Sequence, residues 1–457
     1  MDLNGILQSA ERGLWGPGTL ALLLGTGLFL TVRTDFLPWK NLGWAMGAAL
    51  GREARQSGGT GGVSPFSALM TSLAATIGTG NIVGVATALV AGGPGALVWM
   101  EVSAIAGLAL KYAECMLAVK YRSRNWQGQW QGGPMYVMRA ALGAPGAVLG
   151  GLYALFAVGA SFGIGGMTQS NSIAGALGSV WGVPAWAAGL GTALLALAVV
   201  SGGVRGITRV CTALVPAMAL FYLTAGLAVV LGNWENLPAG LWEILRCAIS
   251  PRAAAGGAAG AAVSWADTVR RGISRGVFSN EAGLGSAAIS AASASCGDPV
   301  KQGYISMTGN VIDTMLVCTV TGLAICCSGV LGAADAAGRA VDGAPLVILA
   351  FQTVMGPAGG GFVAVAIVLF AFSSVLGWEY QGETAFSYLF GGRGLPTYRG
   401  LFCLTAAWGA LERLEAVFRL SDVCNALMCL PNLLCLLALS GVVSRETAAF
   451  EARRRGK

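Results

Sequence analysis

Two segments of the sequence place small and polar residues where a run of apolar residues would otherwise continue. The first reads GTGN at 78–81, and the second reads FSNEAGLG at 278–285. Glycines of this kind favour an unwound stretch, whose backbone N–H and C=O groups lack helical partners. Within a membrane, such groups are tolerated only beside a cavity or buried in protein. Each segment could therefore bind an ion or a small polar molecule. For either segment alone, a close crossing of glycine-rich helices is the alternative.

The positions of the two segments in the chain strengthen the first interpretation. They lie about 200 residues apart, each in the opening span of a predicted set of five spans. Five is an odd number, so the two sets run through a membrane in opposite directions, as in an inverted repeat. Paired interruptions at corresponding places in two halves indicate the binding site of a transporter.

The chemistry of broken helices limits what such a site binds. The amino end of a half-helix attracts a carboxylate, while carboxyl ends and unwound carbonyl groups suit a cation. A zwitterionic amino acid together with Na⁺ fits both. Further polar candidates lie in other apolar runs, namely Gln169, Asn171 and the hydroxyls of Ser373 and Ser374. These hydroxyls suit Na⁺, unless each bonds only to the preceding turn of its own helix.

The elements that position these residues must be membrane helices. Of the 457 residues, 55% are hydrophobic and 11% are charged, and 70 are glycine. An ordinary soluble domain carries about 25% charged residues, so this composition excludes a soluble enzyme. Runs long enough to cross a bilayer predict spans at 14–32, 65–91, 96–119, 147–167, 181–200, 210–231, 256–295, 303–331, 360–390, 399–416 and 417–443. Residues 345–356 are too few to cross, and they predict a re-entrant or interfacial helix.

Lysine and arginine are distributed unevenly between alternate loops. Eighteen of the 28 fall on one predicted side: Arg33, Lys40, Arg52, Arg55, Lys120, Arg122, Arg124, Arg139, Arg205, Arg209, Lys301, Arg393, Arg399, Arg445, Arg453, Arg454, Arg455 and Lys457. The opposite loops hold Arg12, Arg246, Arg252, Arg339 and Arg413. Cytoplasmic loops carry the excess of positive charge, so we expect the amino terminus outside and the carboxyl terminus inside. The net charge of +7 then reports topology and predicts no nucleic-acid partner.

The sequence contains no histidine and 11 cysteines without a C-x-x-C pair. A Ser-His-Asp triad, a zinc site built on histidine and a histidine proton relay are excluded. The cysteines lie in or beside apolar runs, as buried structural thiols do. We expect no enzyme activity, no cofactor and no obligate protein partner. A cation channel stays open as an alternative, and it would conduct ions without a bound amino acid.

Long motifs in the chain resemble a known family. They include IGTGNIVGVATALVAGGPGALVWMEV, QGGPMYV, RGVFSNEAGLGSA, DPVKQG, VIDTMLVCTVTGL and FSSVLGWEYQGE, in this order over nearly the whole chain. These motifs are similar to those of the alanine or glycine:cation symporter family. The resemblance implies an all-α polytopic membrane protein of about 11 transmembrane helices. One extra amino-terminal helix would precede the five-plus-five inverted repeat of the leucine-transporter fold. It also implies uptake of small neutral amino acids, alanine or glycine, coupled to Na⁺ across a bacterial cell membrane.

The family's functional residues carry over to matching positions in this chain. The resemblance implies that the amino acid contacts Thr79, Gly80, Asn81, Gln169, Phe278, Ser279 and Trp378. It implies a sodium site formed by the carbonyls of Ala74 and Ile77 with the hydroxyls of Ser373 and Ser374. A second ion site could combine Asn81 with Thr76, Asn310 or Asp313.

The fold implied by the resemblance divides the chain into four parts. Residues 1–64 hold the extra helix and a cytoplasmic loop, 65–231 the first repeat, 232–443 the second repeat with outer loop helices, and 444–457 a basic tail.

Charged residues inside the predicted spans leave alternatives open. Asp267 and Arg271 have the spacing of a helical ion pair, but Asp267 could instead contact the substrate ammonium group. Glu101, Glu114 and Lys111 are expected at the membrane edges or in pairs. Glu281 and Asp313 keep proton coupling open. Neither the choice among alanine, glycine and serine nor the preferred enantiomer follows from the residues.

Overall fold

A computed structural model describes residues 3–56, 61–125, 127–250, 264–335, 338–412 and 414–456. Several sequence-based predictions lie outside these residues. They are the start of the span 256–295, up to residue 263, and the positions of Arg252, Arg413 and Lys457.

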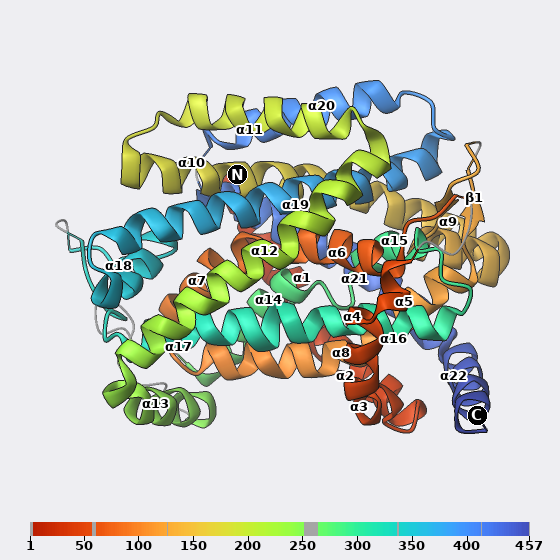
Figure 1. Ribbon diagram of the computed structural model, residues 1–457, viewed down its shortest axis with the longest axis horizontal. Helices are drawn as coiled ribbons and strands as arrows, with labels where there is room; N and C mark the ends of the chain where they lie inside the picture. Colours follow the sequence, from red (N-terminus) through yellow and green to blue (C-terminus); the bar gives the residue numbers. More distant parts are fainter. Residues whose placement is uncertain are drawn as a thin grey trace.

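Helices make up nearly all of the described chain (Figure 1). They are α1 Leu3–Leu14, α2 Pro17–Arg33, α3 Leu37–Lys40, α4 Leu42–Leu50, α5 Arg52–Arg55, α6 Pro65–Thr76, α7 Val83–Gly92, α8 Ala96–Lys120, α9 Pro134–Ala160, α10 Thr168–Trp181, α11 Ala185–Val200 and α12 Gly203–Gly232. The second half contains α13 Leu237–Ile249, α14 Trp265–Asn280, α15 Ser286–Ala292, α16 Pro299–Asn310, α17 Thr319–Cys327, α18 Ala344–Met355, α19 Ala358–Phe390, α20 Leu395–Gly409, α21 Leu414–Ala438 and α22 Ser440–Arg455. A short antiparallel hairpin joins β1 Ser123–Arg124 to β2 Trp130–Gln131.

Among the described residues, seven helical stretches are long and apolar enough to cross a membrane. They are Gln8–Arg33, Ala96–Lys120, Pro134–Trp181, Gly203–Gly232, Pro299–Cys327, Ala358–Phe390 and Val417–Ala438. Three further apolar helices, α7, α11 and α18, are shorter. The two predicted broken spans are divided into α6 with α7 and α14 with α15, and neither half alone reaches a full crossing length. The protein is therefore all-helical and multi-pass, while eleven spans and the inverted repeat stay predictions.

One predicted span has the wrong length. The span expected at 147–167 is part of a longer helical path over Pro134–Trp181, which is kinked near its start at Gly143, where φ is 64°. In its middle, Ser161–Met167 forms a π-helical turn, which inserts extra residues without ending the helix. This turn contains Gly163, Gly165 and Gly166, and from the sequence alone these glycines look like a helix break. Residues 345–356, expected as a short helix, correspond to α18.

The helices pack in two groups that share α12 and α21. In the first group, α8 packs against α14, α15 and α16, and in the second, α19 packs against α9 and α10 while α11 packs against α20. The long helix α12 contacts α6 on one side and α19 on the other, and α21 packs against α9. Figure 1 shows α11 and α20 at the upper edge and α8 with α16 lower in the view. Both broken helices belong to the first group, because α7 packs against α14 and α6 packs against α15 and α16, and α6 also contacts α12 and α19.

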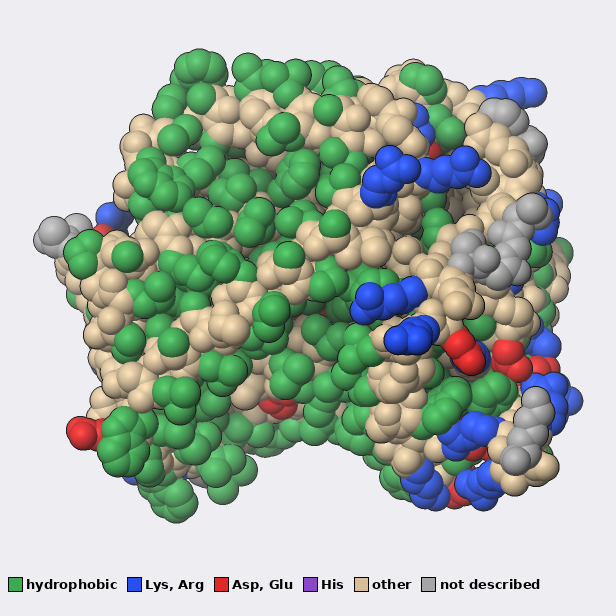
Figure 2. Space-filling model, in the orientation of Figure 1, with side chains coloured by type: hydrophobic (Ala, Val, Ile, Leu, Met, Phe, Trp, Pro, Cys, Tyr) green, Lys and Arg blue, Asp and Glu red, His purple; other side chains and the backbone are tan. Residues whose placement is uncertain are grey.

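Basic side chains gather at one end of the molecule. In Figure 2, most visible Lys and Arg side chains lie at the right-hand end, beyond a broad hydrophobic surface. This end carries α3, α5, the hairpin and α22 (Figure 1). Ion pairs connect distant segments of the chain at this end. Lys301 contacts Glu53 at 2.9 Å, and Lys120 contacts Glu446 at 2.7 Å. The loops predicted to share one side of the membrane therefore lie together.

Candidate functional site

The first broken helix loses its regular hydrogen bonds just after Thr76. The helix α6 begins at Pro65, where the Ser64 hydroxyl accepts a bond from the amide of Ser67, and it ends before Ile77. A short 3₁₀ turn over Thr79–Asn81 follows, and α7 starts at Val83. In this turn the Gly78 amide bonds to the Thr76 carbonyl and to Asn81 Oδ1, at 2.9 and 3.0 Å. These bonds replace the helical bond to the Ala74 carbonyl.

Carbonyl groups freed in this way point toward α19. Ser374 Oγ donates to the carbonyls of Ala74 and Ala75, both at 3.0 Å. Ser373 Oγ lies 3.4 Å from the carbonyls of Ala74 and Ile77, and 2.8 Å from the carbonyl of Phe370 in its own helix. The four groups expected around Na⁺ are thus adjacent, and the Ala75 carbonyl, which sequence reasoning missed, joins them. Neutral oxygens of this kind suit a hard monovalent cation.

A carboxylate lies on the other side of the first break. Asn81 Nδ2 donates to Asp313 Oδ1 at 2.5 Å and to the Asp313 carbonyl at 3.0 Å. Asp313 Oδ2 also accepts from Thr314 at 2.9 Å and from Ser279 at 3.4 Å. These contacts connect both broken helices to the π-helical turn Val311–Cys318.

The other two candidates for a second ion site point elsewhere. The Thr76 hydroxyl bonds to the Leu73 carbonyl, and Asn310 Nδ2 bonds to the Ala104 carbonyl, both at 3.4 Å. Of the residues considered with Asn81, only Asp313 contacts it among the hydrogen bonds of the described residues.

Most residues expected to hold the amino acid converge on the 3₁₀ turn. Gln169 Oε1 accepts from the Thr79 amide at 3.2 Å. Gly80 faces the second broken helix: a Cβ atom there would lie 3.2 Å from the Phe278 ring and 3.4 Å from Ser279 Cα. The Thr79 hydroxyl is buried and has no hydrogen-bond partner among the described residues. A small polar ligand would supply that partner.

Trp378, expected to contact the amino acid, has a partner at the second break. Its Nε1 donates to Glu281 Oε1 at 2.8 Å, so the side chain joins α19 to the second break. The absence of a side chain at Gly165 makes room for it, because a Cβ atom there would overlap Trp378. Asn171 turns away, donating to the carbonyls of Gly409 and Glu412.

The second break is fixed by charged and polar side chains from several helices. After α14 the backbone enters left-handed conformations at Glu281, Gly283 and Gly285, with φ of 54°, 92° and 77°. Glu281 also accepts from Ser286 at 2.6 Å. Tyr153 donates to the Leu284 carbonyl at 2.9 Å.

Lys111 and Glu114 belong to this network. Lys111 Nζ donates to the Asn280 carbonyl at 2.8 Å, and Glu114 Oε1 accepts from the Gly283 amide at 2.9 Å and from Asn432 at 2.7 Å. Lys111 and Glu114, expected at the membrane edges or in pairs, are at most 2% exposed, so both are buried within the protein. Their partners lie more than 160 residues away, which no local pattern reveals.

An ion pair lies between the second break and a cavity. Arg275 contacts Asp422 at 2.8 Å, and its guanidinium lies over the rings of Phe278 and Phe418, 5.4 and 5.1 Å from their centroids. A cavity of about 340 Å³ adjoins this pair and is also lined by Glu11 and Arg271.

The prediction that Asp267 forms an ion pair with Arg271 is wrong. Asp267 lies 3.5 Å from Arg270, one position earlier on the same helix, and it accepts a hydrogen bond from the Ser264 hydroxyl at 2.6 Å. Its position at the start of α14 favours this carboxylate, because the helix amino end is positive.

The opposite ends of the two broken helices are joined by backbone bonds. The Val63 amide donates to the Ser293 carbonyl at 3.0 Å, and the Ser295 amide donates to the Val63 carbonyl at 2.7 Å. Arg122 donates to the carbonyls of Ala294 and Cys296 and lies over the Trp130 ring. These bonds hold the start of α6 against the segment that follows α15.

Known proteins match this chain over nearly its whole length. A family model described as the sodium:alanine symporter family matches residues 1–457. The sodium/alanine symporter AgcS of Methanococcus maripaludis is 44% identical over 462 residues, covering 100% of this chain and 99% of that protein. GlnT of Bacillus subtilis, named as a probable sodium/glutamine symporter, is 34% identical over 96% of this chain and 89% of its own length.

Solved structures share the fold at low sequence identity. The crystal structure of MhsT in complex with L-phenylalanine has a TM-score of 0.56 and 16% identity, covering 84% of this chain and 89% of that chain. A manganese transporter of Eremococcus coleocola gives 0.51 and 14%, with 85% and 81% covered.

Proposed function

Because the chain belongs to the sodium:alanine symporter family, and is therefore a secondary active amino-acid:cation symporter, we propose that it couples the uptake of alanine or glycine to Na⁺. The observation that carries this proposal is the contact between Ser373, Ser374 and the freed carbonyls of the first break. These oxygens carry no formal charge, and they link a broken helix to a helix of the other group. A cation bound among them would hold α6 against α19, and this would favour one conformation over the others.

The amino acid would bind next to this ion, between the two breaks. Its carboxylate would meet the backbone amides of the 3₁₀ turn and the Thr79 hydroxyl, which lacks a partner in the described protein. Gly80 and the Phe278 ring are in close contact, so the space for a ligand side chain is small. This crowding favours alanine and glycine over longer side chains. Trp378 would act indirectly in this account, by positioning Glu281.

The transport cycle would be alternating access. The group that contains both broken helices rocks against the group built on α19, and the two ligands leave on the opposite side. The protein would lie in the cell membrane with its amino terminus outside, so the basic end faces the cytoplasm. The four-part division at residues 64, 231 and 443 belongs to the same proposal.

Purified protein in vesicles tests the proposal directly. We expect labelled alanine to accumulate when Na⁺ is outside, and we expect unlabelled glycine and alanine to compete. Equal accumulation after Na⁺ is replaced by choline at constant pH on both sides would refute sodium coupling. A dependence on a pH gradient alone would instead favour proton coupling through Glu281 or Asp313. Ion flux without amino acid would identify a channel.

A further inference from the structure

A groove opens on the hydrophobic surface between α6 and α12. Its volume is about 530 Å³, and its walls include Phe66 and Ser67 on one side and Ala213, Pro216 and Ala217 on the other. The three α12 residues are exposed, and α12 is one of the membrane-crossing helices. Small side chains on α12 leave the hollow, and Leu220, which also lines it, is exposed on the apolar surface. The dimensions and apolar walls suit an acyl chain.

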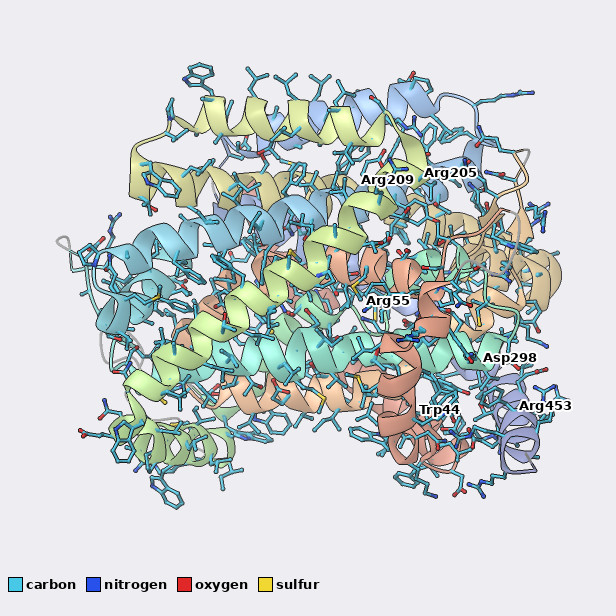
Figure 3. The ribbon with its side chains drawn as sticks, in the orientation of Figure 1. Trp44, Arg55, Arg205, Arg209, Asp298 and Arg453 are labelled. Carbon is cyan, nitrogen blue, oxygen red and sulfur yellow. The ribbon has the colours of Figure 1, made fainter. Side chains whose placement is uncertain are left out.

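Arginines stand on both sides of the basic end of this groove. Arg55 lines it directly, with its guanidinium 4.9 Å from the Phe66 ring centroid. On α12, Arg209 precedes Ala213 by four residues, so it lies one turn beyond the groove on the same helix face, whereas Arg205 lines a separate hollow with Gln131 and Glu383. Figure 3 shows Arg205 and Arg209 on α12 and Arg55 on α5 at this end of the molecule.

Some other basic residues of the same end have acidic partners within the protein. Arg453 pairs with Asp298 at 3.2 Å (Figure 3), and the hydrogen bond and charge of Lys301 lower the pKa of the Glu53 carboxyl. Within the described part of the chain, no hydrogen bond or ion pair joins Arg55, Arg205 or Arg209 to another residue. All three are exposed. Their charge is available to an external anion.

We propose that the α6–α12 groove binds an anionic phospholipid, with one acyl chain along the apolar walls and the phosphate between Arg55 and Arg209. Basic pockets between membrane helices recognise anionic headgroups in this way, and the cytoplasmic leaflet is the one rich in them. The orientation proposed above places the basic end, and with it these arginines, at the cytoplasmic leaflet. The bound lipid would brace α6, whose far end carries the Ala74 and Ala75 carbonyls, against α12.

Spin-labelled lipids measure this binding without any transport. The protein is placed in phosphatidylcholine vesicles, and association of spin-labelled phosphatidylglycerol is compared with that of spin-labelled phosphatidylcholine. We expect selective association of phosphatidylglycerol with the unmodified protein. Each arginine near the headgroup contributes about 1 kcal/mol, so R55Q/R209Q should lower the selectivity roughly fivefold for each arginine removed. The matched control is R393Q, an exposed arginine in the loop after α19, which should leave selectivity unchanged.

A second variant tests the apolar walls. A217W fills the groove while all arginines stay in place, and we expect it to lower the association of phosphatidylglycerol. Thermal unfolding of each variant checks that the protein is folded. Unchanged selectivity in R55Q/R209Q, an equal loss in R393Q, or unchanged association in A217W would overturn the proposal. None of these measurements of lipid association involves an amino acid or Na⁺. A negative result would therefore refute the lipid site and leave the proposed transport function untouched.

Discussion

The two broken helices differ in what surrounds their unwound residues. At the first break, free carbonyls meet the neutral hydroxyls of Ser373 and Ser374. At the second, Lys111, Glu114 and Glu281 already occupy the freed backbone groups or their neighbours. The first break has oxygens that a cation can share, whereas the second is saturated by the protein's own charges. We infer that the first break exchanges ligands and the second positions the helix against which they bind.

The largest expected effect comes from opening the network of the second break. Glu281→Ala leaves the buried Trp378 N–H and the Ser286 hydroxyl without their carboxylate. Each orphaned group costs about 1–3 kcal/mol, so we expect the two together to lower the unfolding free energy by about 2–6 kcal/mol. Thermal unfolding in detergent measures it. Glu281→Gln keeps acceptor and donor atoms at this position and should unfold near the original temperature.

The same pair of variants separates structure from proton coupling. If Glu281 only positions the helix, Glu281→Gln retains sodium-dependent uptake at the same half-saturating Na⁺ concentration. Loss of uptake in a fully folded Glu281→Gln protein would show that the carboxylate itself takes part in the transport cycle. The inference that the second break only positions its helix would then be refuted.

Substitution at the first break should affect transport more than stability. A Cβ atom at Gly78 would overlap Ser374 Oγ. Overpacking of this kind costs about 1–3 kcal/mol, and here it displaces the proposed ion ligands. We therefore expect Gly78→Ala to lower uptake more than about tenfold while the protein stays folded. The control is Gly84→Ala in α7, where the nearest atom to the new Cβ would be 3.9 Å away. Equal uptake in both variants would remove the first break from the ion site.

The two serines should differ in degree. Ser374 lies 3.0 Å from two freed carbonyls, whereas Ser373 lies 3.4 Å from its pair and also bonds within its own helix. Loss of one neutral ligand is worth about 1 kcal/mol, or roughly fivefold. We expect Ser374→Ala to raise the half-saturating Na⁺ concentration by about that factor and Ser373→Ala by less. Uptake measured over a range of Na⁺ concentrations checks this order, and unchanged Na⁺ dependence in both variants would contradict it.

The smallest expected effect concerns the space for the ligand. In Gly80→Ala the new Cβ would lie 3.2 Å from the Phe278 ring, so the ring must shift by a few tenths of an ångström. We expect alanine to lose about twofold in affinity and glycine to lose less, because glycine needs less room. Competition curves for the two amino acids measure this difference. A larger loss for glycine would show that Gly80 acts through the backbone.

Local patterns in the sequence predict the breaks, and the structure confirms that the helices stop there. Glycines at 78–80 and 283–285 act within a few residues of themselves, so a single sequence reveals their effect. The same reasoning misplaces the end of the span at 167, because a π-helical turn also contains glycines and differs from a break only in its hydrogen bonds.

Long-range partners were beyond sequence reasoning. Glu114 bonds to Gly283 and Asn432, and Trp378 bonds to Glu281, and none of these partners is close in the sequence. A buried charge is explained by the group that compensates it, and here that group lies on another helix. The resemblance to a family supplied the sodium ligands, whose roles stay a prediction.

Parallel measurement of Na⁺ and alanine fluxes in the same vesicles tests the central claim most directly. The account predicts that the two fluxes in the unmodified protein keep a fixed ratio and that Ser373→Ala/Ser374→Ala lowers both together. The result that would contradict a sodium site between the first break and α19 is a folded double variant that accumulates alanine at the original rate and with the original Na⁺ dependence.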